Sequence, residues 1–447
     1  MSPNDLNEIN VFDDAADNMD VIKTIIDRRN QEDGFYIVDI GDIINKHREW
    51  ITKIPRVTPH YGMSIKPILQ LHFSPSSKLI SAVKCNPDPN VIKILAALNT
   101  GFDCASEQEI RQVMQYGVQA DRIIFANPYK CPSHIKYAKK MNIEQITADS
   151  ELELLKIKDL YSEAKIVIRI RCDAKNSECN LGLKFGCEPD EDAVRLIQLT
   201  ANLGLTLHGF SFHVGSPCGE LNAYSRGIGI CKRLIAIAKS MGCQDVQLID
   251  IGGGFPGQSG TDIDKLANVI NDAIHDLDSS IRVVSEPGRY YVESAFTVAS
   301  FLHSKKIVHK NGKFMRMYYA NIGTYNSFLD ELICPNTKVL RILFEPASDE
   351  KFLSTLWGPT CDSFDVIAKD VLLPELHIGD WLVWENVGAY SLCLSTTFNG
   401  FPIPKVIPFI RKTQWENLMT EIKLMQRSME FIEWSKSVER EHYIENR

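Results

Sequence analysis

The feature that most constrains the fold is a regular alternation of short β-rich runs with helical stretches. The runs lie at residues 79–85, 101–106, 122–127, 145–149, 166–171, 207–215, 246–254 and 281–288. Between them lie segments with helical spacing, such as NVIKILAALNT and EQEIRQVMQYG. This rhythm predicts a parallel sheet, and eight repeats of it predict a closed (β/α)8 TIM-like barrel of the α/β class. An open doubly wound sheet is the alternative, but its glycine-rich turn should follow the first strand, whereas here GGG follows the seventh.

After about residue 295 the runs are separated by turns with fewer helical stretches, as in FTVASFLH and WLVWENVGAY. This pattern predicts a C-terminal antiparallel β domain. The strand-like FYIVDIGDI near the N-terminus could pair with that sheet. We therefore expect an N-terminal segment contributing to the β domain, a barrel, the β domain and a helical tail, at residues 1–55, 56–295, 296–412 and 413–447.

Composition excludes several classes of protein. The 447 residues include 49 Lys and Arg against 57 Asp and Glu, a net charge of −8, which argues against a nucleic-acid-binding protein. No apolar run approaches the roughly 18 residues of a membrane span, and the start of the chain is acidic, unlike a signal peptide. The 12 cysteines lack metal-ligand spacing. We expect a cytosolic protein with reduced thiols, no membrane segment and no bound metal.

Polar residues and glycines mark the carboxyl end of every predicted barrel strand. They are Lys84, Asp103, Asn127, Asp149, Arg169, His213, the glycines 252–254 and the motif 286–289. The active site of such barrels lies at this face. A succession of such residues therefore predicts a site there.

The chemistry of these residues points to one ligand. Lys84 in AVKCN follows a buried strand, where burial should disfavour its charged form and leave an amine able to attack carbonyls. Taken alone, a lysine reaching the barrel mouth is the simpler interpretation. The loop DIGGGFPG can bring backbone amides close to a phosphate, and EPGR adds a carboxylate and a guanidinium. Pyridoxal phosphate (pyridoxal 5'-phosphate) uses all of these groups.

The motifs that carry these residues occur in order along the chain: AVKCN, TGFDCASEQEI, RIIFANPYK, SFHVGS, DIGGGFPG, SEPGRYYV, WGPTCD, GDWL, ENVGAY and FNGF. With them the sequence resembles the eukaryotic ornithine decarboxylase family of pyridoxal-phosphate-dependent barrel enzymes, over about residues 30–410. The resemblance implies a decarboxylase with a barrel followed by a β domain. It also implies a head-to-tail homodimer whose two sites each use residues of both subunits.

The resemblance also assigns roles. Lys84 would bond to the cofactor's aldehyde, Glu286 would keep its pyridine nitrogen protonated, and His213 would stack on the ring. Asp103 and Arg169 would line the cofactor, with Pro287 beside them. The phosphate would be held by Ser216, Gly252, Gly253, Gly254, Gly288, Arg289 and Tyr390. Cys361, from the other subunit, would protonate the carbanion left when CO2 departs, and Asp362 would belong to the substrate pocket.

The substrate pocket departs from the family pattern. Where the family reads GVYGSFN followed by CILYDH, this chain reads GTYNSFLDELICPN from residue 323. Ile333 then replaces a tyrosine, Cys334 replaces the aspartate that receives the distal amine of ornithine, and Ile322 replaces a further aspartate. A buried ammonium without its carboxylates is unfavourable, so we predict an apolar substrate, with leucine giving isopentylamine. The alternative is an ornithine decarboxylase that makes putrescine and in which Asp362 alone holds ornithine.

A third interpretation is an inactive regulator that keeps the fold only to bind antizyme. Such relatives lose parts of the cofactor set, whereas this chain keeps Arg289 and Tyr390, which favours retained pyridoxal phosphate. Residues 117–140 match the family's antizyme-binding region and contain Lys130, Lys136, Lys139 and Lys140. An ordinary basic barrel helix explains this stretch equally well.

About twenty residues between Pro59 and Ala82 are an insertion relative to the family. It could loop out beyond the closed end of the barrel or disturb the first strand.

Overall fold

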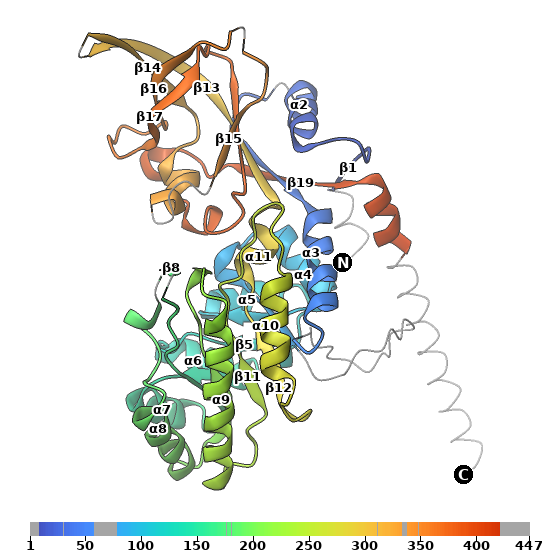
Figure 1. Cartoon of the computed structure of the whole chain (residues 1–447), viewed down its shortest axis with the longest axis vertical. Coiled ribbons are helices and arrows are strands. Elements are labelled where there is room, and N and C mark those ends of the chain that lie inside the picture. The colour runs from blue at the N-terminus through green and yellow to red at the C-terminus, as the bar shows by residue number, and fades with distance from the viewer. Residues whose placement is uncertain are drawn as a thin grey trace.

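The computed structural model describes residues 9–29, 31–57, 78–175, 177–179, 181–310, 312–332, 338–346 and 348–420. Most of the predicted insertion lies outside these ranges. The described chain has two parts, a barrel and a β domain, stacked along the long axis of the molecule (Figure 1).

Within the described residues, eight parallel strands close into a barrel in the order β11-β12-β3-β4-β5-β6-β7-β9. They are β3 (Lys78–Ala82), β4 (Gly101–Cys104), β5 (Ile123–Phe125), β6 (Gln145–Ala148), β7 (Lys165–Arg169), β9 (Thr206–Ser211), β11 (Leu248–Asp250) and β12 (Arg282–Ser285). The closure is continuous, since β12 pairs with β3 and β11 pairs with β9. The predicted barrel is confirmed.

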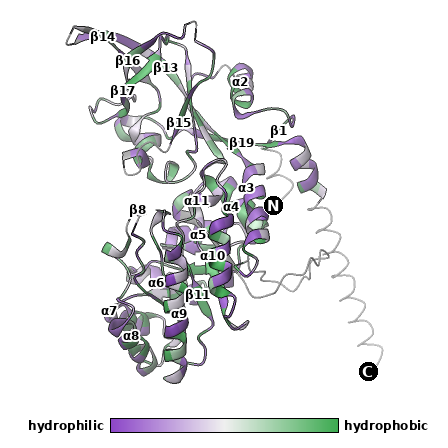
Figure 2. Cartoon of the chain, viewed as in Figure 1, coloured by the Kyte–Doolittle hydropathy of each residue, from purple (hydrophilic) through white to green (hydrophobic). Residues whose placement is uncertain are grey.

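Helices cover the outside of the barrel. They are α4 (Pro89–Ala97), α5 (Glu107–Met114), α6 (Pro132–Lys140), α7 (Glu151–Leu160), α8 (Glu191–Asn202), α9 (Asn222–Ser240), α10 (Asp264–Ile274) and the short α11 (Gly288–Val292). Local signals begin them: Ser106 Oγ accepts the Glu109 N–H at the start of α5, and Pro89 opens α4 behind its N-cap Asp88. Figure 2 shows hydrophobic and hydrophilic residues mixed along these helices, as one buried face per helix requires.

The β domain is built on a nine-stranded sheet in the described residues. Its strands are β1 (Asn10–Phe12), β2 (Phe35–Asp39), β13 (Phe296–Lys310), β14 (Lys313–Ala320), β15 (Val339–Ile342), β16 (Lys351–Trp357), β17 (Val366–Pro374), β18 (Trp381–Glu385) and β19 (Lys405–Arg411). The sheet is mixed rather than purely antiparallel, because β1–β19, β19–β2 and β14–β16 pair in parallel. Strands separated by long stretches of chain are not joined by hairpins, so nothing forces them to run antiparallel.

The N-terminal part of the chain joins both units. Helix α2 (Asn18–Arg29) packs against the sheet through Val21 and Ile22. Helix α3 (Ile40–Lys53) follows β2 directly and packs on the barrel, where the Trp50 ring centroid lies 4.7 Å from that of Phe255. Lys46 of α3 also donates a hydrogen bond to the Tyr290 carbonyl at 2.7 Å.

The predicted division at residues 55, 295 and 412 stays a prediction. Residues 412–420 are helical, and the rest of the predicted helical tail lies outside the described ranges. None of the helices in the part of the chain described here is long and apolar enough to cross a bilayer.

Two features prepare the site. The barrel interior holds a compact apolar cluster of Ile124, Ala126, Val167, Leu248 and Val284, so the lumen is packed rather than open. The short strands β8 (Ser177–Cys179) and β10 (Ser216–Cys218) pair with each other after β7 and β9. Polar side chains at the carboxyl ends of the barrel strands therefore lie above an apolar floor.

Candidate active site at the carboxyl end of the barrel

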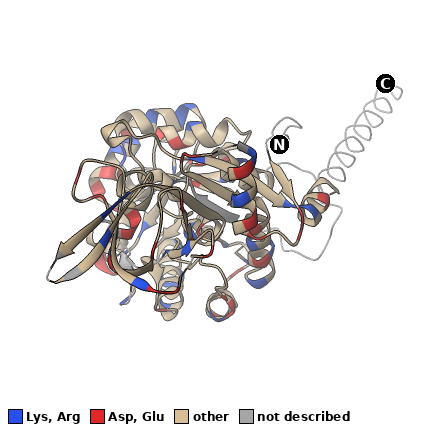
Figure 3. Ribbon diagram, turned by 90° about the horizontal axis from the view of Figure 1, so that it is seen from above, with Lys and Arg blue, Asp and Glu red and all other residues tan. Residues whose placement is uncertain are grey.

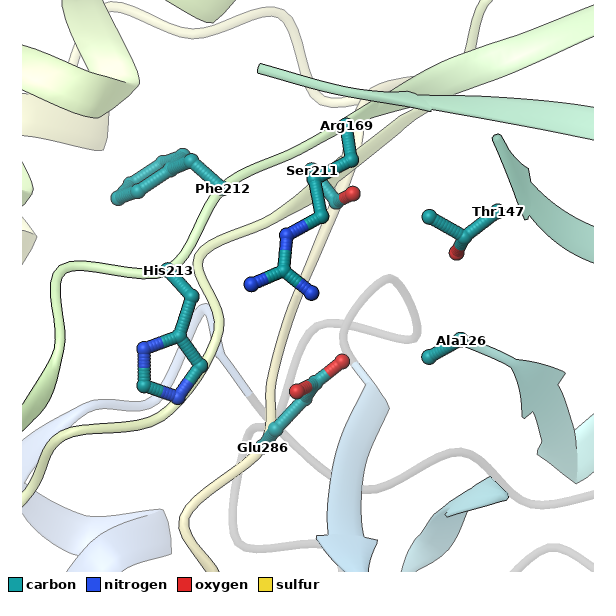
Figure 4. A pocket seen from close by; sticks show the side chains of 7 residues that line it. All are labelled: Ala126, Thr147, Arg169, Ser211, Phe212, His213 and Glu286. Carbon is teal, nitrogen blue, oxygen red and sulfur yellow. The ribbon is translucent and has the colours of Figure 1, made fainter. Parts of the chain in front are cut away.

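A pocket opens where the barrel strands end. It is lined by Ala126, Thr147, Arg169, Ser211, Phe212, His213 and Glu286. Figure 4 shows the guanidinium of Arg169, the imidazole of His213 and the carboxylate of Glu286 converging from different strand ends. The structure thus brings together three residues that were predicted from the sequence.

Lys84 lies in the 3-10 turn η1 (Val83–Cys85) that follows β3. Its Nζ is 2.5 Å from Asp103 Oδ2 and 3.7 Å from Glu286 Oε2. Burial alone would lower the pKa of Lys84, but the two carboxylates outweigh burial and raise the pKa above its ordinary value. The sequence-based expectation that burial disfavours the charged lysine is therefore wrong, because it left out the acids that the barrel places beside it.

Three carboxyl groups lie close together at this position: Asp103 and Glu286 beside Lys84, and Asp250 near Glu286. Burial raises the pKa of Glu286 well above its ordinary value, and the neighbouring charges of Asp103 and Asp250 raise it further. Burial also raises the pKa of Asp250 to about 6. Asp103 Oδ1 and Asp250 Oδ2 are buried and have no hydrogen-bond partner. Such a cluster fits a ligand that brings a protonated ring nitrogen or another cationic group.

His213 presents a neutral ring to the pocket. The Gly215 N–H donates to His213 Nδ1 at 3.0 Å, which leaves the ring proton on Nε2. Burial lowers the pKa of His213 well below its ordinary value, and the charges of Arg169 and Lys84 lower it further. An uncharged flat ring beside an acid is suited to lie against an aromatic ligand.

The glycine loop after β11 is held tightly against this ring. A Cβ on Gly253 would lie 3.0 Å from His213 Nε2 and 2.7 Å from the Glu286 carbonyl oxygen. Gly252 has φ +65, and a Cβ there would lie 2.3 Å from the Phe212 carbonyl oxygen. Gly254 continues the loop with φ +100. Only glycines allow this close approach of the backbone to the neighbouring strand ends.

Arg289 lies in α11, which follows the carboxyl end of β12, and is buried. Its Nη1 donates to Glu293 Oε1 at 2.8 Å, whereas its Nε has no partner. Its guanidinium carbon lies 5.2 Å from the ring centroid of Tyr390, whose backbone N–H donates to the Cys85 carbonyl at 3.0 Å. A buried guanidinium with an unused donor next to the lysine turn suits a phosphate.

The other predicted cofactor residues lie nearby. The Gly288 N–H donates to the Glu286 carbonyl at 2.8 Å and closes a tight turn around Pro287. Ser216 is half-buried at the start of β10, opposite Cys179, and does not line the pocket.

Cys361 and Asp362 lie elsewhere, on the loop between β16 and β17. Cys361 is exposed, and its backbone N–H donates to Asn399 Oδ1 at 3.0 Å. Asp362 Oδ2 accepts a hydrogen bond from Tyr325 Oη, and its Oδ1 accepts the Phe364 N–H at 3.1 Å. Neither residue lines the pocket of its own chain.

Of the predicted substrate residues, Ile333 and Cys334 lie outside the described ranges. Ile322 is described and is 1% exposed. Sequence reasoning missed Thr147, Ser211, Phe212, Ala126 and Asp250. All five lie inside the predicted β-rich runs and close to the carboxyl ends of the strands, and this position was the available signal.

Comparisons with known proteins agree with this geometry. The family model "Pyridoxal-dependent decarboxylase, pyridoxal binding domain" matches residues 68–293. Ornithine decarboxylase of Mus musculus is 37% identical over 92% of this chain and 87% of its own. Antizyme inhibitor 2 of Xenopus laevis is 38% identical over 95% of this chain and 90% of its own.

Solved structures give the same picture. The arginine decarboxylase of Paramecium bursaria Chlorella virus has a TM-score of 0.78 at 34% identity, covering 87% of this chain and all of that one (100%). A lysine/ornithine decarboxylase from Vibrio vulnificus, complexed with cadaverine, has a TM-score of 0.74 at 28% identity, covering 88% of this chain and 99% of that one.

Proposed function

Since the chain belongs to the family of pyridoxal-dependent ornithine and arginine decarboxylases, an enzyme family that uses pyridoxal phosphate, we propose that it decarboxylates an L-amino acid with an apolar side chain, leucine above all. The products would be isopentylamine and CO2. The three decarboxylases named above act on ornithine, arginine or lysine/ornithine according to their names. The proposal therefore separates this chain from them by its substrate.

The site residues fit the cofactor. We assign Lys84 to bond to its aldehyde, Glu286 to hold a proton at its ring nitrogen and His213 to cover its ring face. Arg289, with its unused buried Nε, and the backbone of the glycine loop would bind its phosphate. A cationic group on the cofactor would offset the buried charge of Asp103 and Asp250, whose Oδ1 and Oδ2 atoms, respectively, have no hydrogen-bond partner. When bound, pyridoxal phosphate supplies an electron sink that allows the carboxylate to leave as CO2.

The substrate proposal rests on the carboxylates available to receive an ammonium. Asp362 is the one that remains, because Cys334 and Ile322 replace two aspartates of the family pattern. Both oxygens of Asp362 are bound by donors of its own chain, Tyr325 Oη and the Phe364 N–H. Ile322 is buried where the family motif has aspartate. Leaving a buried ammonium without its partner costs about 3–5 kcal/mol, whereas burying a leucine side chain contributes about 1.5–3 kcal/mol. Both effects favour leucine over ornithine.

The test is a direct comparison of substrates. Purified protein with pyridoxal phosphate is incubated separately with leucine, ornithine, lysine and arginine, and CO2 and amine are measured by mass spectrometry. We expect the highest kcat/KM for leucine and little putrescine from ornithine. A higher kcat/KM for ornithine than for leucine would overturn the proposal and favour the ornithine decarboxylase alternative.

We also propose a homodimer with shared sites. The exposed loop of Cys361 and Asp362 would enter the pocket of the partner subunit, where the Cys361 thiol would deliver the proton to Cα. Its exposure in the single chain supports this assignment, because a proton donor has to reach the reacting carbon.

Antizyme is a second candidate partner. Antizyme inhibitor 2 is among the relatives, and Lys136, Lys139 and Lys140 of α6 are exposed. Lys130 is not available for such contacts, because its side chain is fully buried and its Nζ lies 2.9 Å from Glu153 Oε1. A docking surface would therefore rest on α6 alone. Figure 3 shows Lys and Arg interspersed with Asp and Glu along the ribbon of the described residues.

A further inference from the structure

The proposed phosphate-binding arginine belongs to a row of four buried charged side chains, in the order Glu293, Arg289, Asp330 and Lys338. Arg289 Nη1 lies 2.8 Å from Glu293 Oε1, and Arg289 Nη2 lies 3.9 Å from Asp330 Oδ1. Asp330 Oδ2 lies in turn 3.1 Å from Lys338 Nζ. The exposed fractions of the four side chains are between 2% and 6%. The signs alternate along the row, so its four charges sum to zero.

The outer half of the row belongs to the segment that carries the predicted substrate pocket. Asp330 lies in the 3-10 turn η5 (Leu329–Leu332), and Lys338 immediately precedes β15. In the alignment used above, Asp330 stands at the cysteine of the family motif CILYDH. This chain therefore places a carboxylate near Arg289 where the family motif has an uncharged residue.

Such a carboxylate competes with a phosphate group for the guanidinium of Arg289. Arg289 already pairs with Glu293, so a second acid bound to it would cancel the charge it can offer to an anion. The Asp330 oxygen stays 3.9 Å from Arg289, beyond hydrogen-bond distance, while the other oxygen contacts Lys338. Lys338 also lies 3.6 Å from Glu331, which is partly exposed. Without Lys338 the row would carry a net negative charge beside the site for a phosphate.

We propose that Lys338 is a positioning residue for the cofactor: by pairing with Asp330 it keeps the Arg289 guanidinium available to a phosphate group. This inference rests on the proposed role of Arg289. It adds a residue from the substrate segment to the binding of the cofactor, and it links the two through one buried carboxylate.

The test measures binding to the apoprotein rather than turnover. Pyridoxal phosphate and pyridoxal, which lacks the phosphate, are titrated separately, with binding followed by equilibrium dialysis. For Lys338→Met we expect the Kd for pyridoxal phosphate to rise about 10- to 100-fold, because the uncompensated Asp330 turns to Arg289. The Kd for pyridoxal should stay unchanged.

The double variant Asp330→Asn with Lys338→Met decides between positioning and mere structural support. It removes the competing charge together with its partner, so the Kd for pyridoxal phosphate should return to within about threefold of the wild type. Lys305→Met is the matched control, since it breaks a half-buried pair with Glu375 in the same domain and should leave both affinities unchanged.

Three results would overturn the inference: an unchanged Kd in Lys338→Met, no recovery in the double variant, or an equal loss of pyridoxal binding. Arg289→Met separates the premise from the inference. Suppose that Arg289→Met weakens the binding of pyridoxal phosphate but not of pyridoxal, and that Lys338→Met changes neither affinity. The role of Arg289 then stands and that of Lys338 fails. If Arg289→Met has no such effect, the assigned role of Arg289 fails.

Discussion

The charge state of Lys84 depends on its neighbours more than on its burial. The carboxylates of Asp103 and Glu286 hold the proton on this lysine in the free protein, so it has to lose that proton before it can attack a carbonyl carbon. Lys130 is the contrasting case, since burial lowers its pKa to about 8 although Glu153 lies beside it. The proposal that Lys84 is the reactive lysine thus rests on the acids and the ring around it rather than on an easily lost proton.

We therefore expect borohydride to fix pyridoxal phosphate on Lys84 and not on Lys130. Lys84→Ala should abolish both the labelled peptide and decarboxylation, because no other described lysine lies against the acids of the pocket. Peptide mapping by mass spectrometry gives the site directly. A label on Lys130 in the wild type would show that the site has been assigned to the wrong lysine.

Burial of the acid Asp250 lowers the stability of the apoprotein at neutral pH. Burial raises the pKa of Asp250 from its ordinary value of 3.8 to about 6, so the folded protein favours the protonated form. Stability from this group is therefore lost as the pH rises from about 4 to 6. Asp250→Asn should raise the free energy of unfolding at pH 7 by about 2–3 kcal/mol and flatten that pH dependence.

The Asn side chain can still accept the Gly252 N–H that Asp250 Oδ1 now accepts at 2.9 Å. Thermal unfolding of the apoprotein between pH 4 and 7 measures the effect. A variant less stable than the wild type at pH 7 would contradict the prediction.

The proposed substrate preference should be reversible by two substitutions. Ile333→Tyr with Cys334→Asp restores the residues of the family motif, and an added carboxylate gives a distal ammonium its partner. We expect the ratio of kcat/KM for ornithine over leucine to rise about 10- to 100-fold. Steady-state kinetics with both amino acids measures this ratio, with Cys334→Ser as the uncharged control.

The sequence was informative for residues with unusual chemistry at strand ends. Lys84, Arg169, His213 and Glu286 meet at one mouth, as the barrel rhythm predicts. Thr147, Ser211 and Asp250 were missed because a single threonine, serine or aspartate within a β-run is not unusual enough to indicate a site. The pKa of Lys84 was misjudged because it depends on side chains 19 and 202 residues away, which come together only in the closed barrel.

At the scale of elements, periodicity predicted the barrel but not the pairing in the β domain. Strands β2 and β19 are neighbours although the whole barrel separates them in sequence. No local pattern indicates which distant strand a given strand will pair with. The parallel pairs of this sheet were therefore beyond what spacing alone can predict.

Helix α6 gives a prediction about partners. If antizyme binds there through these lysines, Lys136→Glu with Lys140→Glu should weaken binding about tenfold or more, since reversing their charges removes electrostatic complementarity at the interface. Lys265→Glu on α10 is the control, an exposed lysine on another barrel helix. Surface plasmon resonance with purified antizyme measures the difference. Equal affinities for all three proteins would remove α6 from the proposed interface.

At the scale of the whole molecule, the proposed catalytic groups are divided between the barrel and the exposed loop of Cys361. Mixing Lys84→Ala protein with Cys361→Ala protein should therefore restore activity. Random exchange of subunits makes half of the dimers mixed, each with one intact site, so about a quarter of wild-type activity is expected. No activity in the mixture, with exchange shown by native mass spectrometry, would place both groups in one subunit.

The pairing of β2 with strands near the C-terminus has a consequence for folding during translation. All five residues of β2 end up buried, yet its partner β13 begins 257 residues after Asp39, and β19 comes later still. At translation rates of about 5–20 residues per second, the ribosome needs roughly 13 to 50 s to produce that first partner. During this time FYIVD is an apolar strand without a sheet. The nascent protein thus needs β2 to be protected from aggregation while the barrel is being synthesised. Truncation before residue 405 would leave β2 permanently without its partner strand β19.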